Sequence, residues 1–306
     1  MTPQPCKVVA IVQARMSSTR LPGKVLLDIA GQPMLARVVE RVRRAASVDQ
    51  VVVATTTDPK DDAVEVFCIE RSYPYIRGSL NDVLDRFYQA ARKFGADVVV
   101  RITADCPVID PGVIDATVAA FWGFAEKAQP KGRNEWKEAL TGEAARSPAY
   151  DFAASRLPPP WKRTYPIGLD VEVCSFHGLE RAWKEATAQY EREHVMPYFY
   201  DQEGRFRYTV INHAQDFGSM RWTVDTSQDL ELIRQIYARF PGRDDFSWFE
   251  ILELVLSDES LGKINAGTHH KNVYEVDQAG THHQGSGTHC DDDPLGGDES
   301  HSGNPE

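Results

Sequence analysis

The sequence lacks the features of a membrane-bound or exported protein. None of its apolar runs approaches the roughly 20 residues that a spanning helix needs. We expect no export signal, because the first residues show no basic segment followed by an apolar stretch and a cleavage site. The body of the chain has no basic face, which argues against binding to nucleic acid. With 42% hydrophobic and 26% charged residues over 306 positions, the composition is that of an ordinary globular enzyme.

The sequence is also poor in cysteine, and its five cysteines include no CxxC pair. Scattered single thiols lack the ligand spacing of a zinc site and do not suggest a disulfide framework. We therefore expect reduced thiols and a cytoplasmic protein. The cysteines are Cys6, Cys68, Cys106, Cys174 and Cys290.

Negative charge is concentrated towards the C-terminus. The formal net charge is −11, and from residue 266 onward there are eight Asp or Glu against one Lys. The same segment holds six of the nine histidines and almost no apolar residues, so it cannot bury enough surface to offset the entropy of ordering. We predict a folded domain over residues 1–262 and a disordered acidic, His- and Gly-rich tail over residues 263–306. Cutting the chain after Gly262 should then change little.

Apolar β-branched runs alternate with helical patterns in the first half of the chain. Strands are predicted at residues 8–12, 50–57, 75–76 and 97–105. Helices are predicted at residues 34–46, 61–71 and 81–94. The alternation predicts an α/β fold with a mostly parallel central sheet and helices on both faces. In such sheets, ligands bind beyond the carboxyl ends of the strands.

The second half of the chain is less regular. Residues 123–148 are polar, and we interpret them as an insertion with at most a short surface helix. Strands are expected at residues 169–173 and 207–211, with a strand-like run at 220–226. Helices are expected at residues 176–188, 190–200 and 247–256, and one more after a capping box that runs from Thr226 to Asp229.

The loop after the first strand is dense in cations and small donors. The stretch IVQARMSSTRLPGKV, residues 11–25, holds Arg15, Arg20 and Lys24 with hydroxyl side chains between them. It is not a Walker P-loop, which needs an early glycine and a hydroxyl after the lysine. Its charged donors and free backbone N–H groups nevertheless favour a phosphate site. Pro22 and Gly23 should turn the chain so that Lys24 points back inwards.

Two aspartates follow strand-like runs and are candidate metal ligands. Asp105 comes directly after the strand at 97–105, and Asp225 lies in the run WTVDT. Each carboxylate is either a magnesium ligand or a helix cap, because Mg²⁺ takes one or two carboxylates together with substrate phosphates. Asp170 and Glu172 share one face of a strand, where they either face an acceptor or make structural hydrogen bonds. Cys106 has no evident histidine partner, so we expect no catalytic thiol.

Several longer motifs together resemble one enzyme family. They are VQARMSSTRLPGKVL, VVVATTTDPKDDA, RGSLNDVLDRFYQAA, VVRITADCPVIDP, RTYPIGLDVEV, REHVMPYF and RWTVDTSQDLELI. The chain resembles the SpsF-type branch, named for spore-coat polysaccharide synthesis, of the acylneuraminate and ketodeoxyoctonate cytidylyltransferase family. The resemblance covers residues 7–258 apart from the insertion. It implies a GT-A-like nucleotidyltransferase fold and an enzyme that couples CTP to an acceptor, usually an acidic sugar, and releases pyrophosphate.

The resemblance also implies roles for individual residues. Arg15, Lys24 and Asp105 would be catalytic, and Mg²⁺ would be held by Asp105 and Asp225. The residues expected to line the nucleotide are Gln13, Ala14, Ser18, Arg20, Gly78, Asp82, Arg101 and Thr103.

The acceptor side is harder to assign. Tyr165, Asp170, Glu172 and His194 are the candidate acceptor residues, and Arg163 and Lys162 offer positive charge for an acid group. Ile167 stands where relatives commonly carry a polar residue, and Met196 is less polar than a common Thr. A carboxylated sugar of the nonulosonate or ulosonate type is the predicted acceptor, and a phosphonate would satisfy the same cations.

Two other interpretations remain open at this point. A GT-A glycosyltransferase would use an Asp-x-Asp metal motif, to which Asp170 and Glu172 are a loose match. A nucleotide-binding subunit without activity is the second alternative. We also expect a homodimer, because the resembled family uses the region 176–200 as a subunit contact and this region is rich in aromatic residues.

Overall fold

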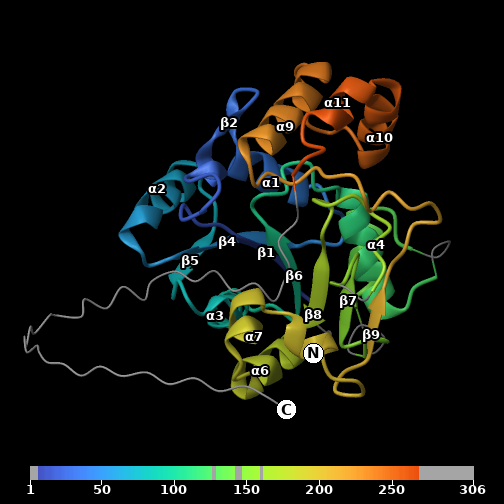
Figure 1. Ribbon diagram of the computed structural model, residues 1–306. Helices are drawn as coiled ribbons and strands as arrows, with labels where there is room; N and C mark the ends of the chain where they lie inside the picture. The colour runs from blue at the N-terminus through green and yellow to red at the C-terminus, as the bar shows by residue number, and fades with distance from the viewer. Residues whose placement is uncertain (1–5, 126–128, 142–146, 159–160, 269–306) are drawn as a thin grey trace, which may run out of the picture. The chain divides into compact units, whose positions relative to one another are not determined.

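The β-branched runs form one central sheet in the computed structural model, which describes residues 6–125, 129–141, 147–158 and 161–268 (Figure 1). Within these residues the sheet has seven strands in the order β5-β4-β1-β6-β8-β7-β9. The strands are β1 (Val8–Gln13), β4 (Gln50–Thr56), β5 (Tyr75–Gly78), β6 (Val98–Thr103), β7 (Phe152–Ala154), β8 (Glu172–Ser175) and β9 (Tyr208–Val210). A small separate hairpin joins β2 (Asp28–Ile29) to β3 (Gln32–Pro33).

The sheet is mostly parallel, as predicted. The pairs β5–β4, β4–β1 and β1–β6 are parallel, and so is β7–β9. Strand β8 runs antiparallel to both β6 and β7. The register places Gln13 opposite Thr103 and Arg101 opposite Glu172, so polar side chains lie together near the carboxyl ends of β1 and β6.

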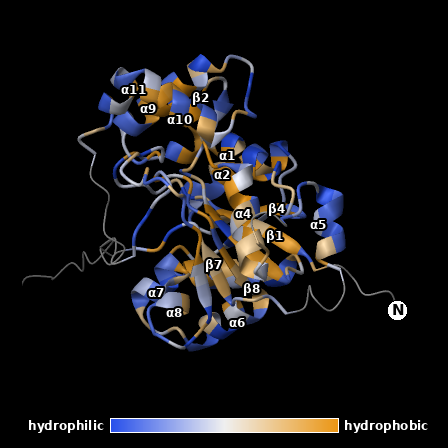
Figure 2. Ribbon diagram, turned by 90° about the vertical axis from the view of Figure 1, so that its right-hand side faces the viewer, coloured by the Kyte–Doolittle hydropathy of each residue, from blue (hydrophilic) through white to orange (hydrophobic). Residues whose placement is uncertain are grey.

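Helices cover both faces of the sheet because the strand residues alternate in direction. Val8, Ala10 and Val12 belong to one buried cluster, and Val9 and Ile11 belong to the other. The first cluster is covered by α1 (Met34–Val42), α2 (Asp62–Glu70) and α4 (Pro111–Trp122). The second is covered by α3 (Val83–Lys93), α6 (Phe176–Glu185) and α8 (Pro197–Tyr200). Figure 2 colours β1 and α4 mostly as hydrophobic, whereas α7 (Gln189–His194) is largely hydrophilic.

The last helices lie together at one end of the domain (Figure 1). They are α9 (Ser227–Arg239), α10 (Trp248–Ser257) and α11 (Glu259–Lys263). The predicted capping box is present, since Thr226 accepts a hydrogen bond from the Asp229 amide and Asp229 accepts one from that of Thr226. The folded domain extends beyond the predicted boundary at residue 262, because Asn265 is only 7% exposed. Residues 269–306, most of the predicted tail, lie outside the described residues.

Three of the predicted elements differ from those observed. The helix predicted over 190–200 is broken, because Val195 adopts a left-handed φ of 71° and Pro197 starts the separate helix α8. The strand predicted over 169–173 starts later, at Glu172, because Gly168 turns the chain with a φ of 106°. The run 220–226 forms no strand and has only an isolated bridge between Ile167 and Arg221.

The predicted insertion is better packed than a surface helix. Within residues 123–148, α5 (Arg133–Ala139) buries Trp136, which is 2% exposed and packs against Phe124. Arg133 donates a hydrogen bond to the Val48 carbonyl, which attaches the helix to the body of the domain. Residues 126–128 and 142–146 of this stretch lie outside the described residues. None of the helices described here is long and apolar enough to span a bilayer.

Candidate active site at the strand ends

The loops that follow β1, β4 and β6 meet at the carboxyl ends of these strands, as the parallel order requires. The Ala14 amide donates to the Ala54 carbonyl at 3.0 Å, and the Ala104 amide donates to the Gln13 carbonyl at 3.0 Å. The Met16 amide donates to the Asp61 carboxylate at 2.6 Å. Ala14 itself is 4% exposed, so its contribution to a nucleotide site would come from its backbone.

The basic loop folds back on itself so that Lys24 points inwards, as predicted. Gly23 adopts a φ of 70°, and its amide donates to the Met16 carbonyl at 2.9 Å. The left-handed conformation favours glycine there. Ser18 takes part in the turn, because its hydroxyl accepts a hydrogen bond from the Leu21 amide at 3.4 Å. Lys24 is 8% exposed, although lysine is almost never buried unless it is paired.

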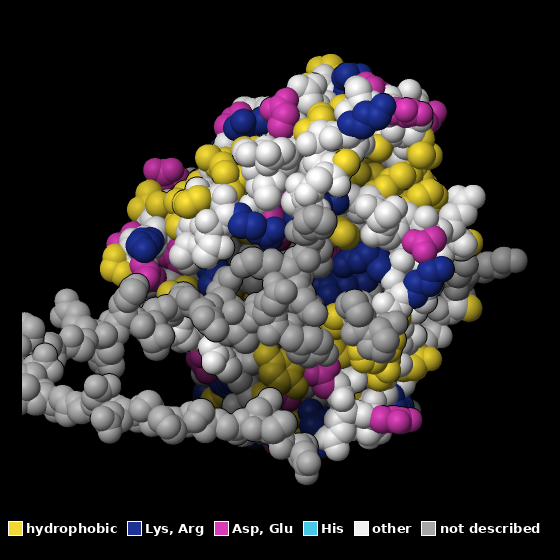
Figure 3. Space-filling view, viewed as in Figure 1, with side chains coloured by type: hydrophobic (Ala, Val, Ile, Leu, Met, Phe, Trp, Pro, Cys, Tyr) yellow, Lys and Arg dark blue, Asp and Glu magenta, His cyan; other side chains and the backbone are white. Residues whose placement is uncertain are grey.

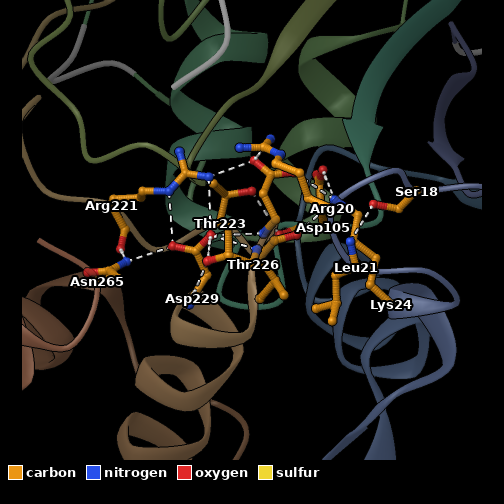
Figure 4. Close-up of polar contacts among 12 residues, drawn as sticks. Ser18, Arg20, Leu21, Lys24, Asp105, Arg221, Thr223, Thr226, Asp229 and Asn265 are labelled. Carbon is orange, nitrogen blue, oxygen red and sulfur yellow. Dashed lines mark hydrogen bonds and ion pairs between the residues drawn. The ribbon is translucent and has the colours of Figure 1, made fainter. Parts of the chain in front are cut away.

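Lys24 lies between the two predicted metal ligands (Figure 4). Its ammonium is 2.9 Å from an oxygen of Asp105 and 2.8 Å from an oxygen of Asp225. It also donates to the Val224 carbonyl at 2.8 Å. Residues far apart in the sequence thus form one charged cluster, and we call Lys24, Asp105 and Asp225 the charge centre.

Further cations surround Asp225. Arg20, predicted to contact the nucleotide, lies 2.8 Å from this carboxylate, and Arg221 lies 2.6 Å from it. Burial by itself would raise the pKa of Asp225, but the charges of Lys24 and Arg20 and the hydrogen bond from Arg221 hold it well below its usual range. Burial alone would likewise lower the pKa of Lys24, but Asp105 and Asp225 raise it. The carboxylate and the ammonium are therefore both charged at neutral pH.

Neither aspartate of the charge centre is a helix cap. Asp110 is the N-cap of α4, and Thr226 is the N-cap of α9. The side chains of Asp105 and Asp225 are instead aimed at one shared cation position. Two carboxylates fit the hard oxygen ligands that Mg²⁺ prefers, with the remaining positions left for phosphate oxygens. In the described part of the chain, no group of three or more His, Cys, Asp or Glu forms a complete metal site.

A buried arginine that the sequence reading missed lies on the predicted nucleotide side. Arg86, on α3, is 2% exposed and donates to the Ser79 carbonyl at 2.5 Å. Its side chain also packs closely on Gly78, where an added Cβ would lie 2.7 Å from the Arg86 Cγ. Burial and, second, the charge of Arg15 lower the pKa of Arg86 to about 10. Arg15 and Arg86 therefore bring two positive charges next to the loop that contains Gly78.

The buried position of Arg86 could have been noticed in the sequence. It falls among Val83, Leu84 and Phe87, on the apolar face of a predicted helix. A charged residue in such a place needs buried partners, which is a signal of a functional or structural site.

Asp82, which was predicted to line the nucleotide, makes structural contacts with its carboxylate. It is the N-cap of α3 and accepts from the Asp85 amide at 2.9 Å. It also forms an ion pair with Arg192 of α7 at 2.5 Å. The Asp82 carboxylate thus joins two helices beside the predicted nucleotide site.

Arg101 links a predicted nucleotide residue to a predicted acceptor residue. It forms an ion pair with Glu172 on the neighbouring strand, and it donates to the side chain of Gln13 at 3.1 Å. The three side chains connect the neighbouring strands β1, β6 and β8. The Thr103 hydroxyl lies 3.3 Å from the sulfur of Cys106. That thiol is buried, which raises its pKa well above the usual value, so it is not a nucleophile.

Asp170 lies beside two arginines, one of which the sequence reading missed. Arg163 is 2.6 Å from the Asp170 carboxylate, and Arg156 is 3.5 Å from the same oxygen. The loop that carries Asp170 is attached to the run 220–226, because the Trp222 amide donates to the Ile167 carbonyl at 2.7 Å. Ile167 therefore contributes through its backbone, which needs no polar side chain. The acceptor candidates Asp170 and Glu172 are both paired with arginine.

The other acceptor candidates do not come together. Tyr165 packs edge-on against Trp248 of α10 at 5.6 Å and against His213 at 6.0 Å, within the cluster on the α1 and α4 side. His194 ends α7, which packs against α3 on the opposite side of the sheet. Lys162 lies at the surface and pairs with Asp216 at 3.2 Å. On the face drawn in Figure 3, Lys and Arg side chains gather in the middle, below α9–α11.

The comparisons with known proteins agree with this geometry. The family model for cytidylyltransferases matches residues 9–240. The spore coat polysaccharide biosynthesis protein SpsF of Bacillus subtilis is 29% identical over 255 residues, which cover 81% of this chain and 93% of that protein. The 3-deoxy-manno-octulosonate cytidylyltransferase of Anaeromyxobacter dehalogenans is 31% identical over 245 residues, or 76% of this chain and 98% of that protein.

A solved structure supports the same assignment of the fold. A cytidylyltransferase from Leptospira borgpetersenii superposes with a TM-score of 0.72 at 28% sequence identity, and the match covers 84% of this chain and 97% of that one. The predicted α/β nucleotidyltransferase fold is therefore confirmed.

Proposed function

The chain belongs to the cytidylyltransferase family, and from that premise we propose that it transfers the cytidylyl group of CTP to a small acidic sugar with release of pyrophosphate. The observation that carries the proposal is the charge centre, in which Lys24 joins Asp105 and Asp225 at the carboxyl edge of the sheet. Such a cluster combines a phosphate-binding cation with two ligands suited to Mg²⁺. The glycosyltransferase alternative is set aside, because Asp170 and Glu172 are paired with arginines and the family assignment points to nucleotidyl transfer.

The reaction is an in-line displacement at the α-phosphorus of CTP. A hydroxyl oxygen of the acceptor forms the new bond to phosphorus as the bond to the bridging oxygen of pyrophosphate breaks. Lys24 and Arg15 stabilise the negative charge on the α-phosphate and on the leaving pyrophosphate. Asp105 and Asp225 would hold Mg²⁺, which would supply Lewis-acid polarisation of the phosphate oxygens. Arg20 and Arg221 keep the Asp225 carboxylate in place and charged.

The arginines near the sheet end support an acidic acceptor. Among the described residues, Arg101, Arg156 and Arg163 form ion pairs with two carboxylates, Asp170 and Glu172. The two acids are thereby neutralised, and the cluster keeps an excess of one positive charge. An anionic group is attracted to such a cluster, so the two acids do not repel it. The name of the octulosonate-specific relative favours a carboxylated sugar of the ulosonate or nonulosonate type.

The physiological setting follows from the relatives and from the thiols. The relation to SpsF favours a role in the synthesis of a surface or spore-coat polysaccharide. Cys6, Cys68, Cys106 and Cys174 are free thiols, as expected in the cytoplasm. We keep the homodimer as a prediction, although the aromatics that suggested it pack within the chain itself. Trp183 stacks on Tyr88 at 4.1 Å, for example.

A pyrophosphate-release screen tests the proposal. CTP, ATP, GTP and UTP are each mixed with ulosonates, nonulosonates, phosphonates, neutral sugars and sugar 1-phosphates in the presence of Mg²⁺. We expect pyrophosphate from CTP together with a carboxylated sugar. Pyrophosphate release only with neutral sugars or sugar 1-phosphates would refute the carboxylated acceptor. Release only with a phosphonate would mean that the acid group of the acceptor is a phosphonate and not a carboxylate.

A further inference from the structure

We propose that Asn265, in the C-terminal segment after α11, is a positioning residue for the charge centre. The inference rests on the proposed function and deepens it, because it assigns control of Asp225 to a part of the chain that follows the residues matched by the family model, 9–240. The chain of contacts runs from Asn265 through Asp229 and Arg221 to Asp225 (Figure 4).

Both contacts of the Asn265 amide are directed at this chain. The amide nitrogen donates to the Asp229 carboxylate at 2.8 Å and to the Arg221 carbonyl at 3.0 Å. The residue is 7% exposed, so few water molecules can replace these contacts if the side chain is removed. Asn265 therefore binds both members of the Arg221–Asp229 ion pair at once.

Asp229 holds together the backbone on which Asp225 is placed. One of its oxygens accepts from the Asp225 amide and from the Thr226 amide, each at 3.0 Å. Its other oxygen accepts from the Arg221 side chain at 3.0 Å and from Asn265. A displacement of Asp229 is thereby passed to the main chain of Asp225.

Arg221 completes the connection through side chains. Its guanidinium contacts Asp229 on one side and one oxygen of Asp225 on the other, at 2.6 Å. The second oxygen of Asp225 faces Lys24 at 2.8 Å. Because the two oxygens belong to one rigid carboxylate, the angle that Arg221 sets together with Arg20, which contacts the same oxygen at 2.8 Å, decides where the oxygen that faces Lys24 lies. Loss of the Asn265 contacts should change that angle, since partners behind a ligand set its orientation.

A merely structural role for Asn265 predicts a different result. If the residue only fastened the end of α11 to the domain, its loss would lower thermal stability and leave nucleotide binding unaltered in the folded protein. A positioning role predicts that the affinity for CTP falls when the metal is present and stays unchanged when it is absent. Only the metal complex needs the Asp225 oxygen in its place.

The experiment uses the full chain and the variants Asn265→Ala and Asn265→Ser, with Lys263→Ala as the matched control. Lys263 lies two residues away at the surface and pairs only loosely with Glu259, at 3.4 Å. Calorimetric titration gives the dissociation constant for CTP with saturating Mg²⁺ and again with a metal chelator. Thermal melts of the same samples show that each variant is folded, and Asn265→Ser, which keeps one donor, serves if the alanine variant does not fold.

We expect Asn265→Ala to weaken binding of CTP with Mg²⁺ about tenfold, within the range for removal of a residue behind a metal ligand. Binding without metal should change less than about twofold, and Asn265→Ser should fall between the alanine variant and the wild type. Equal weakening in both conditions, or a lower melting temperature with unchanged binding, would overturn the inference. If the unaltered protein itself fails to bind CTP with Mg²⁺, the proposed function fails instead, which the wild-type titration shows directly.

Discussion

The two halves of the candidate site neutralise their carboxylates in different ways. In the charge centre Asp105 and Asp225 share the ammonium of Lys24, and Asp225 is also paired with Arg20 and Arg221. On the acceptor side each acid forms an ion pair with a different arginine: Glu172 pairs with Arg101, and Asp170 pairs with Arg163. If the proposed Mg²⁺ bound between the two acids, it would displace the Lys24 ammonium, which would then be available to a phosphate. Separate ion pairs keep their partners and present a fixed positive surface. The first arrangement suits reacting groups, and the second suits recognition.

The largest expected effect comes from removing the shared cation. Lys24→Ala should lower turnover about a hundredfold, or about 3 kcal/mol, because one charge-assisted contact to the developing phosphate charge is lost. The variant should also melt at a lower temperature, since two carboxylates then face each other. Steady-state kinetics against Lys137→Ala, an exposed lysine of α5, checks the result. Near-normal turnover in the alanine variant would remove Lys24 from the mechanism.

The second prediction separates the metal role of the charge centre from its structural role. Asp105→Asn should raise the Mg²⁺ concentration needed for half-maximal activity by at least about tenfold, because a neutral amide is a weaker ligand for a hard cation. The fold should survive, since Asp105 caps no helix. Titration of Mg²⁺ at fixed CTP measures the effect, and an unchanged titration curve would argue for a different ligand.

The third prediction concerns the arginines of the acceptor side. Arg163→Ala should raise the KM for the acceptor about tenfold and leave that for CTP nearly unchanged, as expected for a lost contact to a charged group. Its neighbour Lys162 is a matched control, because it lies at the surface with Asp216. We expect less than a twofold change for Lys162→Ala. Equal effects of the two substitutions would place the acceptor elsewhere.

Acid should reduce the contribution of the Asp225 charge to the stability of the fold in a defined range of pH. The cations around Asp225 hold its pKa below the usual value of about 4, despite the opposing effect of burial. A depressed carboxylate pKa contributes stability above the unfolded pKa and loses it as the pH falls towards the folded one. The difference in melting temperature between the wild type and Asp225→Asn should therefore be largest above about pH 5 and shrink below pH 4. A constant difference would mean that Asp225 contributes no charge.

The smallest effects are expected from shortening the chain. A cut after Thr268 should leave the melting temperature and CTP binding unchanged, because the sequence beyond it has no apolar pattern to pack. A cut after Gly262 should have a larger effect, because it removes Asn265: it should lower the melting temperature by about 2–4 °C per kcal/mol lost and weaken binding of CTP with Mg²⁺ about tenfold, as Asn265→Ala does. This corrects the expectation that the earlier cut is harmless. Identical melting curves for the two truncations would show that residues 263–268 contribute nothing.

The positions of Lys24 and Asp105 in the charge centre could be predicted from the sequence, but that of Asp225 could not, because the run 220–226 that carries it forms no strand. The acceptor side could be predicted only in part. Lys24 and Asp105 each follow a buried strand of a parallel sheet, so the strand order alone brings them to one edge. The partners of Asp170 are Arg156 and Arg163, which lie 14 and 7 residues before it and belong to no local pattern that would pair them with it. Arg156 therefore went unnoticed. Tyr165 and His194 were grouped by chemistry, but the sheet separates them.

Arg86 and Asn265 were missed in the sequence because their importance depends on contacts that no motif shows. Arg86 lies within the motif RGSLNDVLDRFYQAA and Asn265 lies outside every motif, but the contacts of both, such as Arg86 to the Ser79 carbonyl, are visible only in the structure. Short local signals found the cap at Thr226 but not the one at Asp82. They did not show that the Asp82 carboxylate also binds Arg192.

Phosphorus NMR of one complete reaction tests the central claim most directly. CTP, Mg²⁺ and a carboxylated ulosonate are incubated with the wild-type chain and followed until the nucleotide is consumed. The account predicts that the three CTP resonances are replaced by one pyrophosphate resonance and one phosphodiester resonance, in equal molar amounts, and that both are absent with Lys24→Ala over the same period. Release of inorganic phosphate, or pyrophosphate without a phosphodiester, would contradict cytidylyl transfer to an acidic acceptor.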